Sequence, residues 1–104
     1  MRGSFTEKVF NIVKQIPEGR VSAYSDIACA LSRGSARAVG SALRRSPGMP
    51  EVPCHRVVLK SGRLGGFSGP GGVPGKKLLL EREGVRVYSG RVAEFEQIRW
   101  KPAP

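Results

Sequence analysis

The feature that most constrains the fold is a pair of short amphipathic segments separated by a glycine-containing turn, Ser32-Arg33-Gly34. In both segments the apolar residues recur at the spacing of one helical face, so the pattern predicts two helices. We expect Ser22 to cap the first and Ser35 to cap the second, which runs from Ala36 to about Arg45. The apolar face of the first helix would carry Tyr24, Ile27, Ala28 and Leu31. Two helices joined by a tight turn are typical of a helix-turn-helix.

The second of these helices has the composition of a DNA-binding helix. Val39, Ala42 and Leu43 form an apolar face, and the outer face is basic and polar, with Arg37, Ser41 and Arg44. Small residues such as Ser35, Ala36 and Gly40 would let its backbone approach a duplex closely. The net charge of +10, from 18 Lys and Arg against 8 Asp and Glu, also suits a polyanion. A surface helix with solvated arginines remains the alternative interpretation.

Further helices are expected at both ends of the chain. Ser4-Phe5-Thr6-Glu7 has the form of a capping box before a helix from Phe5 to about Ile16. A fourth helix is expected from Pro74 to Glu83, with Gly84 after its end, and the tail of residues 85–104 should pack back onto the domain. The expected fold is therefore mainly α, with a small β-hairpin or wing around a winged-helix-like helix-turn-helix.

Between these helices, two segments are expected to be extended or irregular. His55 to Leu59 is a β-branched run that predicts a strand. Leu64 to Gly75 is rich in glycine, matches no phosphate-binding loop, and is expected to be an ordered loop whose backbone approaches a ligand.

Length and composition exclude several classes of protein. A chain of 104 residues predicts one domain, without an N-terminal accessory domain. No apolar run approaches the ~20 residues that cross a membrane, and the N-terminus does not resemble a signal peptide. Two Cys and one His are too few for a structural metal site or a disulfide framework. We expect an intracellular monomer with free thiols, in which Cys29 is a packed, unreactive residue.

The stretch Val52-Pro53-Cys54-His55-Arg56 could carry chemistry. A thiolate is a strong nucleophile, and a neighbouring His or cation favours that form. In an extended chain Cys54 and His55 would point to opposite faces, so the His would reach the sulfur through a bend or a bridging water. Glu83 is the best candidate for a carboxylate that orients the His, with Glu51 and Asp26 as alternatives. A buried, unreactive Cys54 also fits this spacing.

Five segments together resemble the C-terminal domain of O6-alkylguanine-DNA alkyltransferases and the related alkyltransferase-like proteins. The resemblance covers about Phe5 to Gly84 and rests on PEGRVSAYSDIA, SARAVGSALRRSP, VPCHRVV, SGRLGGFSG and KKLLLEREG, of which PCHRV is the most diagnostic. It implies minor-groove binding of double-stranded DNA and extrusion of O6-alkylguanine, with no cofactor. The alkyl group would pass irreversibly to the protein, once per molecule.

The resemblance also implies a role for individual residues. Cys54 would accept the alkyl group, His55 would activate it through a water, and Glu83 would orient the His. Tyr24 would help to rotate the nucleotide out, and Arg37 would fill its place in the stack. Ser35, Ala36, Ser41, Arg44 and Arg45 would complete the DNA-binding surface. The lesion pocket would comprise Tyr24, Ser46, Pro53, Val57, Phe67, Ser68 and Lys76.

Three features depart from the alkyltransferase pattern. Ser46 stands where Asn usually braces the nucleophile loop, and Phe67 stands where Tyr is common. The tail GRVAEFEQIRWKP resembles the alkyltransferase-like group, in which the Cys is typically replaced, although this chain keeps Cys54. The alternative function is therefore a non-catalytic lesion sensor that recruits nucleotide excision repair proteins.

Overall fold

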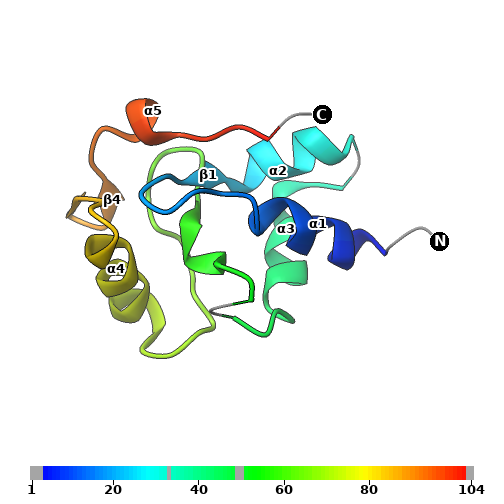
Figure 1. The fold of residues 1–104 in the computed structure, drawn as a ribbon, viewed down its shortest axis with the longest axis horizontal. Helices are drawn as coiled ribbons and strands as arrows, with labels where there is room; N and C mark the ends of the chain where they lie inside the picture. The colour runs from blue at the N-terminus through cyan, green and yellow to red at the C-terminus, as the bar shows by residue number, and fades with distance from the viewer. Residues whose placement is uncertain (1–3, 33, 49–50, 103–104) are drawn as a thin grey trace.

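Three helices from the N-terminal part of the chain pack around one apolar cluster (Figure 1). The computed structural model describes residues 4–32, 34–48 and 51–102. The helices are α1 (Phe5–Val13), α2 (Tyr24–Leu31) and α3 (Ala36–Leu43). Their fully buried contacts include Ile27 and Val39, which the helical spacing placed on the apolar faces, and Val9 of α1.

The connection between α2 and α3 is the turn of a helix-turn-helix, and it confirms the expected fold class. Ser32 and Gly34 both have positive φ, 57° and 77°, which reverses the chain over a few residues; Arg33 lies outside the described residues. A Cβ at position 34 would lie 2.8 Å from two ring atoms of Phe5, so glycine is needed both for its φ and for its size. Ser35 then caps α3, as predicted, by accepting from the Ala38 N–H at 3.1 Å.

A short parallel pairing joins this helical half to the segment that follows Pro53. Strand β1 (Ser22–Ala23) pairs with β2 (Val57–Val58), and both strands are fully buried. On the other side of β1, Val21 bridges to Arg99 in the C-terminal tail. The turn η1 (Cys54–Arg56), one turn of 3₁₀ helix, leads directly into β2.

The C-terminal part forms a second apolar cluster with its own elements. Helix α4 (Gly72–Arg82) is followed by the hairpin of β3 (Val87–Tyr88) and β4 (Arg91–Val92), and then by the short helix α5 (Phe95–Ile98). Val85, Val87, Val92 and Phe95 bury their side chains with Leu80. The tail then runs from α5 back to α2 (Figure 1). The expected fourth helix is present, but it begins at Gly72, inside the segment expected to be a loop, and ends at Arg82. Gly84 follows its end at a φ of 91°.

Several local predictions are wrong. The first helix ends at Val13 and not at Ile16, although Ile16 is still buried. Ser22 does not cap α2, because it belongs to β1 and its hydroxyl donates to the Trp100 carbonyl. Cys29 is exposed, since it points away from the face that buries Ile27.

The boundaries of two other elements also differ from the prediction. The third helix ends at Leu43, with Arg44 as its C-cap. The strand expected from His55 is confined to Val57–Val58, because residues 54–56 form a 3₁₀ turn after Pro53. Alternation of neighbouring side chains in an extended chain therefore does not apply to Cys54 and His55.

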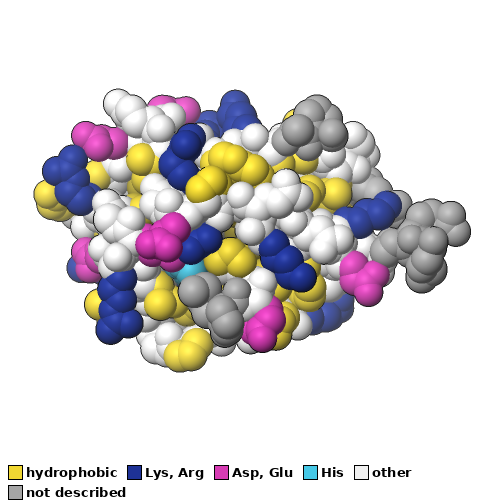
Figure 2. Space-filling view, in the orientation of Figure 1, with side chains coloured by type: hydrophobic (Ala, Val, Ile, Leu, Met, Phe, Trp, Pro, Cys, Tyr) yellow, Lys and Arg dark blue, Asp and Glu magenta, His cyan; other side chains and the backbone are white. Residues whose placement is uncertain are grey.

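Positive charge is distributed widely on the surface. On the face seen in Figure 2, Lys and Arg side chains are spread among hydrophobic and acidic ones. Among the described residues, no helix combines the length and the apolar character needed to cross a membrane.

Candidate functional site

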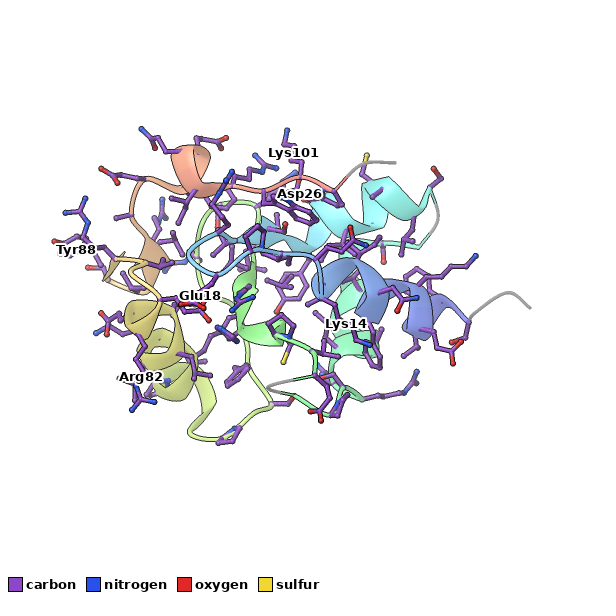
Figure 3. The ribbon with its side chains drawn as sticks, in the orientation of Figure 1. Lys14, Glu18, Asp26, Arg82, Tyr88 and Lys101 are labelled. Carbon is purple, nitrogen blue, oxygen red and sulfur yellow. The ribbon has the colours of Figure 1, made fainter. Side chains whose placement is uncertain are left out.

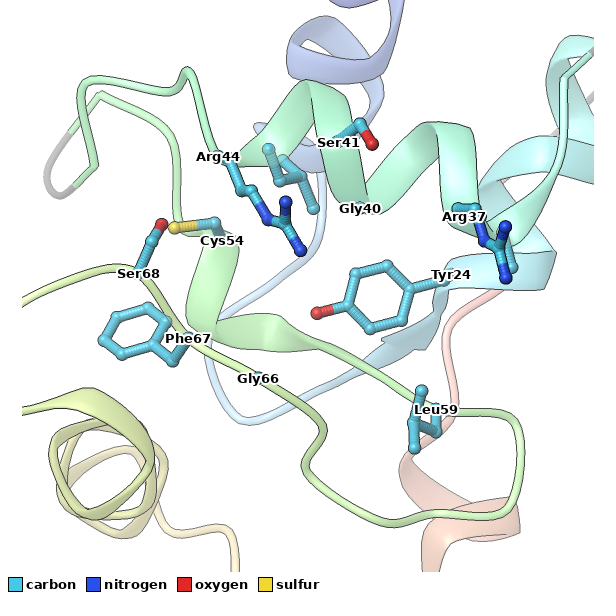
Figure 4. A pocket seen from close by; sticks show the side chains of 12 residues that line it. Tyr24, Arg37, Gly40, Ser41, Arg44, Cys54, Leu59, Gly66, Phe67 and Ser68 are labelled. Atoms are coloured by element: carbon cyan, nitrogen blue, oxygen red, sulfur yellow. The ribbon is translucent and has the colours of Figure 1, made fainter.

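A cavity of about 580 Å³ opens between the helix-turn-helix, the Cys54 turn and the glycine-rich loop (Figure 4). This volume is in the range of small-ligand pockets, about 300–1,000 Å³. In the view of Figure 4, Cys54, Phe67 and Ser68 lie at one end of the cavity and Arg37 at the other, with the Tyr24 ring between them. The lining residues are Tyr24, Ala36, Arg37, Gly40, Ser41, Leu43, Arg44, Cys54, Leu59, Gly66, Phe67 and Ser68.

The structure brings half of the sequence-predicted residues to the walls of this cavity. Cys54 lines it. So do four residues expected to face DNA, namely Ala36, Arg37, Ser41 and Arg44. Three residues expected in the lesion pocket also line it, namely Tyr24, Phe67 and Ser68. Sequence reasoning missed Leu43, Leu59 and Gly66. Leu59 carried a signal, because it ends the apolar run after the Cys.

Other predicted residues do not line the cavity. Val57 is fully buried in the apolar cluster beneath it, and Pro53 is buried before the Cys54 turn. Ser35 is occupied as the cap of α3. The Arg45 guanidinium donates instead to the Thr6 hydroxyl of α1 at 3.4 Å.

The loop before Cys54 is braced by Ser46. The Ser46 hydroxyl accepts from the Gly48 N–H at 3.1 Å and lies 3.6 Å from the Cys54 sulfur, to which it can donate. Ser46 therefore supplies both a turn contact and a sulfur contact, although it has fewer hydrogen-bonding atoms than the Asn expected there. Cys54 itself is half-buried, so its sulfur is reachable from the cavity that it lines.

Behind Cys54, a buried network joins His55 to Glu83. The His55 Nε2 lies 2.9 Å from a Glu83 carboxylate oxygen, and the His side chain is fully buried. The Arg56 guanidinium donates two hydrogen bonds to the same carboxylate, at 3.0 and 2.7 Å, and a third to the Ile16 carbonyl at 2.8 Å. Of the candidate carboxylates, Glu83 is thus the one beside His55. Asp26 pairs with Arg99, and Glu51 is exposed.

The protonation states of this network follow from its surroundings. Burial lowers the pKa of His55, and the nearby Arg56 and Lys76 charges lower it further, although Glu83 opposes them. Burial alone would raise the pKa of Glu83, but the hydrogen bonds from Arg56 and His55 outweigh it and keep that pKa low. A neutral imidazole therefore faces an ionised carboxylate.

These states fix the tautomer of His55. An ionised carboxylate can only accept, so the Nε2 must carry the hydrogen and the Nδ1 must carry the lone pair. The Nδ1 is buried and has no hydrogen-bond partner among the described residues. The network thus presents Nδ1 as a proton acceptor.

Lys76 supports the glycine-rich wall from behind. It is fully buried, and its ammonium donates to the carbonyls of Leu64 and Gly66, the latter at 3.2 Å. The same ammonium lies 5.7 Å from the centre of the Tyr24 ring. Burial lowers the pKa of Lys76 to about 8. The lysine expected in the pocket is therefore located behind its wall.

Sequence comparison identifies the family. A model described as "6-O-methylguanine DNA methyltransferase, DNA binding domain" matches residues 4–85. The chain belongs to this family. The match covers every residue of the cavity and of the network behind it.

Similar proteins include both a methyltransferase and Atl1. The methylated-DNA–protein-cysteine methyltransferase of Sulfolobus acidocaldarius is 48% identical over 84 residues, which are 81% of this chain and 52% of that relative. Atl1 of S. pombe, solved in complex with damaged DNA containing O6-carboxymethylguanine, has a TM-score of 0.83 at 34% identity. That alignment covers 98% of this chain and 100% of Atl1.

A structure of Mycobacterium tuberculosis OGT in complex with DNA has a TM-score of 0.71 at 41% identity, with 80% of this chain and 51% of OGT covered. The chain spans about half the length, or less, of the curated relatives it matches. The family thus places the chain in DNA repair, with both methyltransferase and Atl1 relatives.

Proposed function

We propose that this protein binds duplex DNA through α3, extrudes O6-alkylguanine into the cavity and transfers the alkyl group to Cys54. The observation that carries this proposal is the position of Cys54. It lines a cavity of about 580 Å³, which is in the range of small-ligand pockets, and behind it a neutral His55 is paired with an ionised Glu83. This arrangement combines a nucleophile, a base and a group that orients the base.

The helix-turn-helix supplies a surface suited to the minor groove. Ala36, Gly40 and Ser41 line the cavity from α3, and their small side chains would let the helix backbone approach the DNA. Extrusion of a base costs a few kcal/mol, and less where the base is damaged and poorly paired. Arg37 would offset part of that cost by occupying the vacated position in the stack, while Tyr24 would hold the nucleotide out.

The proposed transfer is a displacement at the alkyl carbon. The Cys54 thiol gives its proton to the His55 Nδ1 through a water, and the sulfur attacks the carbon attached to O6. The carbon–oxygen bond breaks with its electron pair on the guanine. The guanine takes up a proton from water to become normal guanine, and His55 releases the thiol proton to water, so the alkyl group has exchanged places with one proton. A thioether remains on Cys54, and because a thioether resists hydrolysis, each molecule reacts once.

The direct test is mass spectrometry of the protein after incubation with a duplex that carries O6-methylguanine. We expect the Cys54 peptide to gain one methyl group and the peptide of the exposed Cys29 to remain unmodified. Cys54→Ala should abolish transfer and retain lesion binding, whereas Cys29→Ala should retain both. An unmodified Cys54 peptide after long incubation would reject the transfer.

A second candidate function is a lesion sensor without chemistry. The observation that favours it is the alignment with Atl1, which covers the whole of that protein as well as nearly all of this chain. In that case the protein would hold O6-alkylguanine in the cavity and present it to nucleotide excision repair proteins. Tight, lesion-selective binding together with an unmodified Cys54 would support this candidate over the first.

A further inference from the structure

The C-terminal tail forms a hydrogen-bonded edge against β1, in a region beyond the family match at residues 4–85. The Val21 N–H donates to the Ile98 carbonyl at 3.1 Å, and the Trp100 N–H donates to the Val21 carbonyl. The Arg20 guanidinium adds bonds to the carbonyls of Ile98 and Arg99, both at 3.0 Å. The tail is thus fixed next to the strand that leads into α2.

From this edge, Arg99 reaches into the first turn of α2. Its guanidinium donates to both carboxylate oxygens of Asp26, at 2.9 and 2.8 Å, and this pair is largely buried, with 18% and 8% of the two side chains exposed. The guanidinium also lies 5.1 Å from the centre of the Phe95 ring and 3.3 Å from Glu96. Figure 3 shows Asp26 beside the tail, near Lys101.

Asp26 in turn fixes the start of α2. Its carboxylate accepts from the Ala23 N–H at 3.0 Å, and Ala23 is the residue immediately before Tyr24. Tyr24 is the first residue of the helix, so the direction of its ring into the cavity depends on the backbone at this point. A bidentate Arg–carboxylate pair is geometrically specific as well as strong.

We propose that Arg99 is a positioning residue, which acts through Asp26 and the start of α2 to hold the Tyr24 ring against the lesion cavity. This inference rests on the proposed function, because it assigns a tail residue to lesion binding. The contact between Arg99 and Asp26 is an ion pair. Burial alone would raise the pKa of Asp26, but the hydrogen bonds from Arg99 and Ala23 keep that pKa low, so the carboxylate stays ionised.

The test compares Arg99→Gln with Arg86→Gln. Both remove one positive charge from the tail, but the Arg86 side chain is 63% exposed and, among the described residues, forms a salt bridge with the exposed Glu94 alone. We expect Arg99→Gln to reduce the preference for an O6-methylguanine duplex over the undamaged duplex by about tenfold, and Arg86→Gln to leave it within about twofold of wild type. Asp26→Asn, which keeps the shape of the capping side chain, should match Arg99→Gln if the latter folds poorly.

A double-mutant cycle separates positioning from general stability. In a Tyr24→Ala background, Arg99→Gln should change the lesion preference by less than about twofold, because the residue it positions is gone. The Tyr24 ring resonances of the free protein should also shift in Arg99→Gln and not in Arg86→Gln.

The outcomes distinguish the two proposals. If wild type shows a lesion preference but both tail variants change it equally, or if the tenfold loss persists without Tyr24, the positioning role is wrong and the proposed function stands. If wild type shows no lesion preference, the proposed function is wrong, and the role of Arg99 in lesion binding is rejected with it.

Discussion

The free energy of unfolding should rise as the solution becomes mildly alkaline, because the buried ammonium of Lys76 loses its proton there. Its pKa is lowered by burial to about 8 in the folded protein, from an ordinary value of 10.5. Between these two values the unfolded chain holds a proton on Lys76 that the folded chain has released. The unfolded state therefore binds more protons, and the free energy of unfolding rises with pH in this window.

The magnitude follows from the two pKa values. Over the whole range between the two pKa values, the free energy of unfolding should increase by about 3 kcal/mol. Roughly 1.5 kcal/mol of this increase should appear between about pH 8 and about pH 9.5. The window stops there because the pKa of Tyr24 is raised by burial and by Cys54, and that shift reduces stability at higher pH. Urea unfolding followed by the fluorescence of Trp100, with a thiol reductant present, measures the change.

A matched pair of variants isolates the effect. Lys76→Met should abolish the rise in stability, whatever its stability at neutral pH, because it removes the titrating group. Lys77→Met should retain it, since Lys77 is half exposed and pairs only loosely with Glu81, at 3.9 Å. A flat wild-type profile, or the same rise in Lys76→Met, would refute the reasoning.

Variants at four positions and one salt titration test other parts of the structure. Glu83→Gln should slow alkyl transfer at least about tenfold in single-turnover assays while lesion affinity is nearly unchanged, and an unaltered rate would count against the His55 tautomer. Arg37→Ala should weaken binding of the lesion duplex more than that of undamaged DNA, whereas Arg45→Ala should weaken both equally; identical profiles would argue against a stacking role. Gly34→Ala should lower the free energy of unfolding by about 1–3 kcal/mol, measured with urea, because of its positive φ and the Phe5 ring, and a neutral result would contradict the packing. Affinity for either duplex should fall steeply with salt, and a shallow dependence would be incompatible with binding through phosphates.

Local patterns predicted the helical elements well. The capping box at Ser4, in which the Ser4 hydroxyl and the Glu7 carboxylate each accept from the other's backbone at 3.1 Å, is a contact within one turn. The Ser35 cap and the apolar face of α3 are equally local. Such features depend on residues three or four apart, so a single sequence contains the information needed to predict them.

The errors arose where distant residues compete for the same backbone. Ser22 has the chemistry of a helix cap, but β1 pairs with β2 and the Ser22 hydroxyl bonds to Trp100, 78 residues away. The Asp26 carboxylate instead accepts the hydrogen bond from the Ala23 N–H at the start of α2, and it is paired with Arg99, 73 residues away. No periodicity within α2 could have identified either contact.

The geometry around Cys54 shows the same division between local and distant information. The adjacency of Cys54 and His55 could be seen in the sequence, but adjacency does not say which ring nitrogen is the base. Glu83, the C-cap of α4, determines which nitrogen it is by its contact with Nε2, and Arg56 keeps the Glu83 carboxylate ionised. Because the carboxylate accepts a hydrogen bond from the Nε2–H, the Nδ1 is left with the lone pair. On the proposed mechanism, the fold therefore determines which ring nitrogen accepts the proton, and a change at the end of α4 that leaves the PCHRV segment intact would alter that choice.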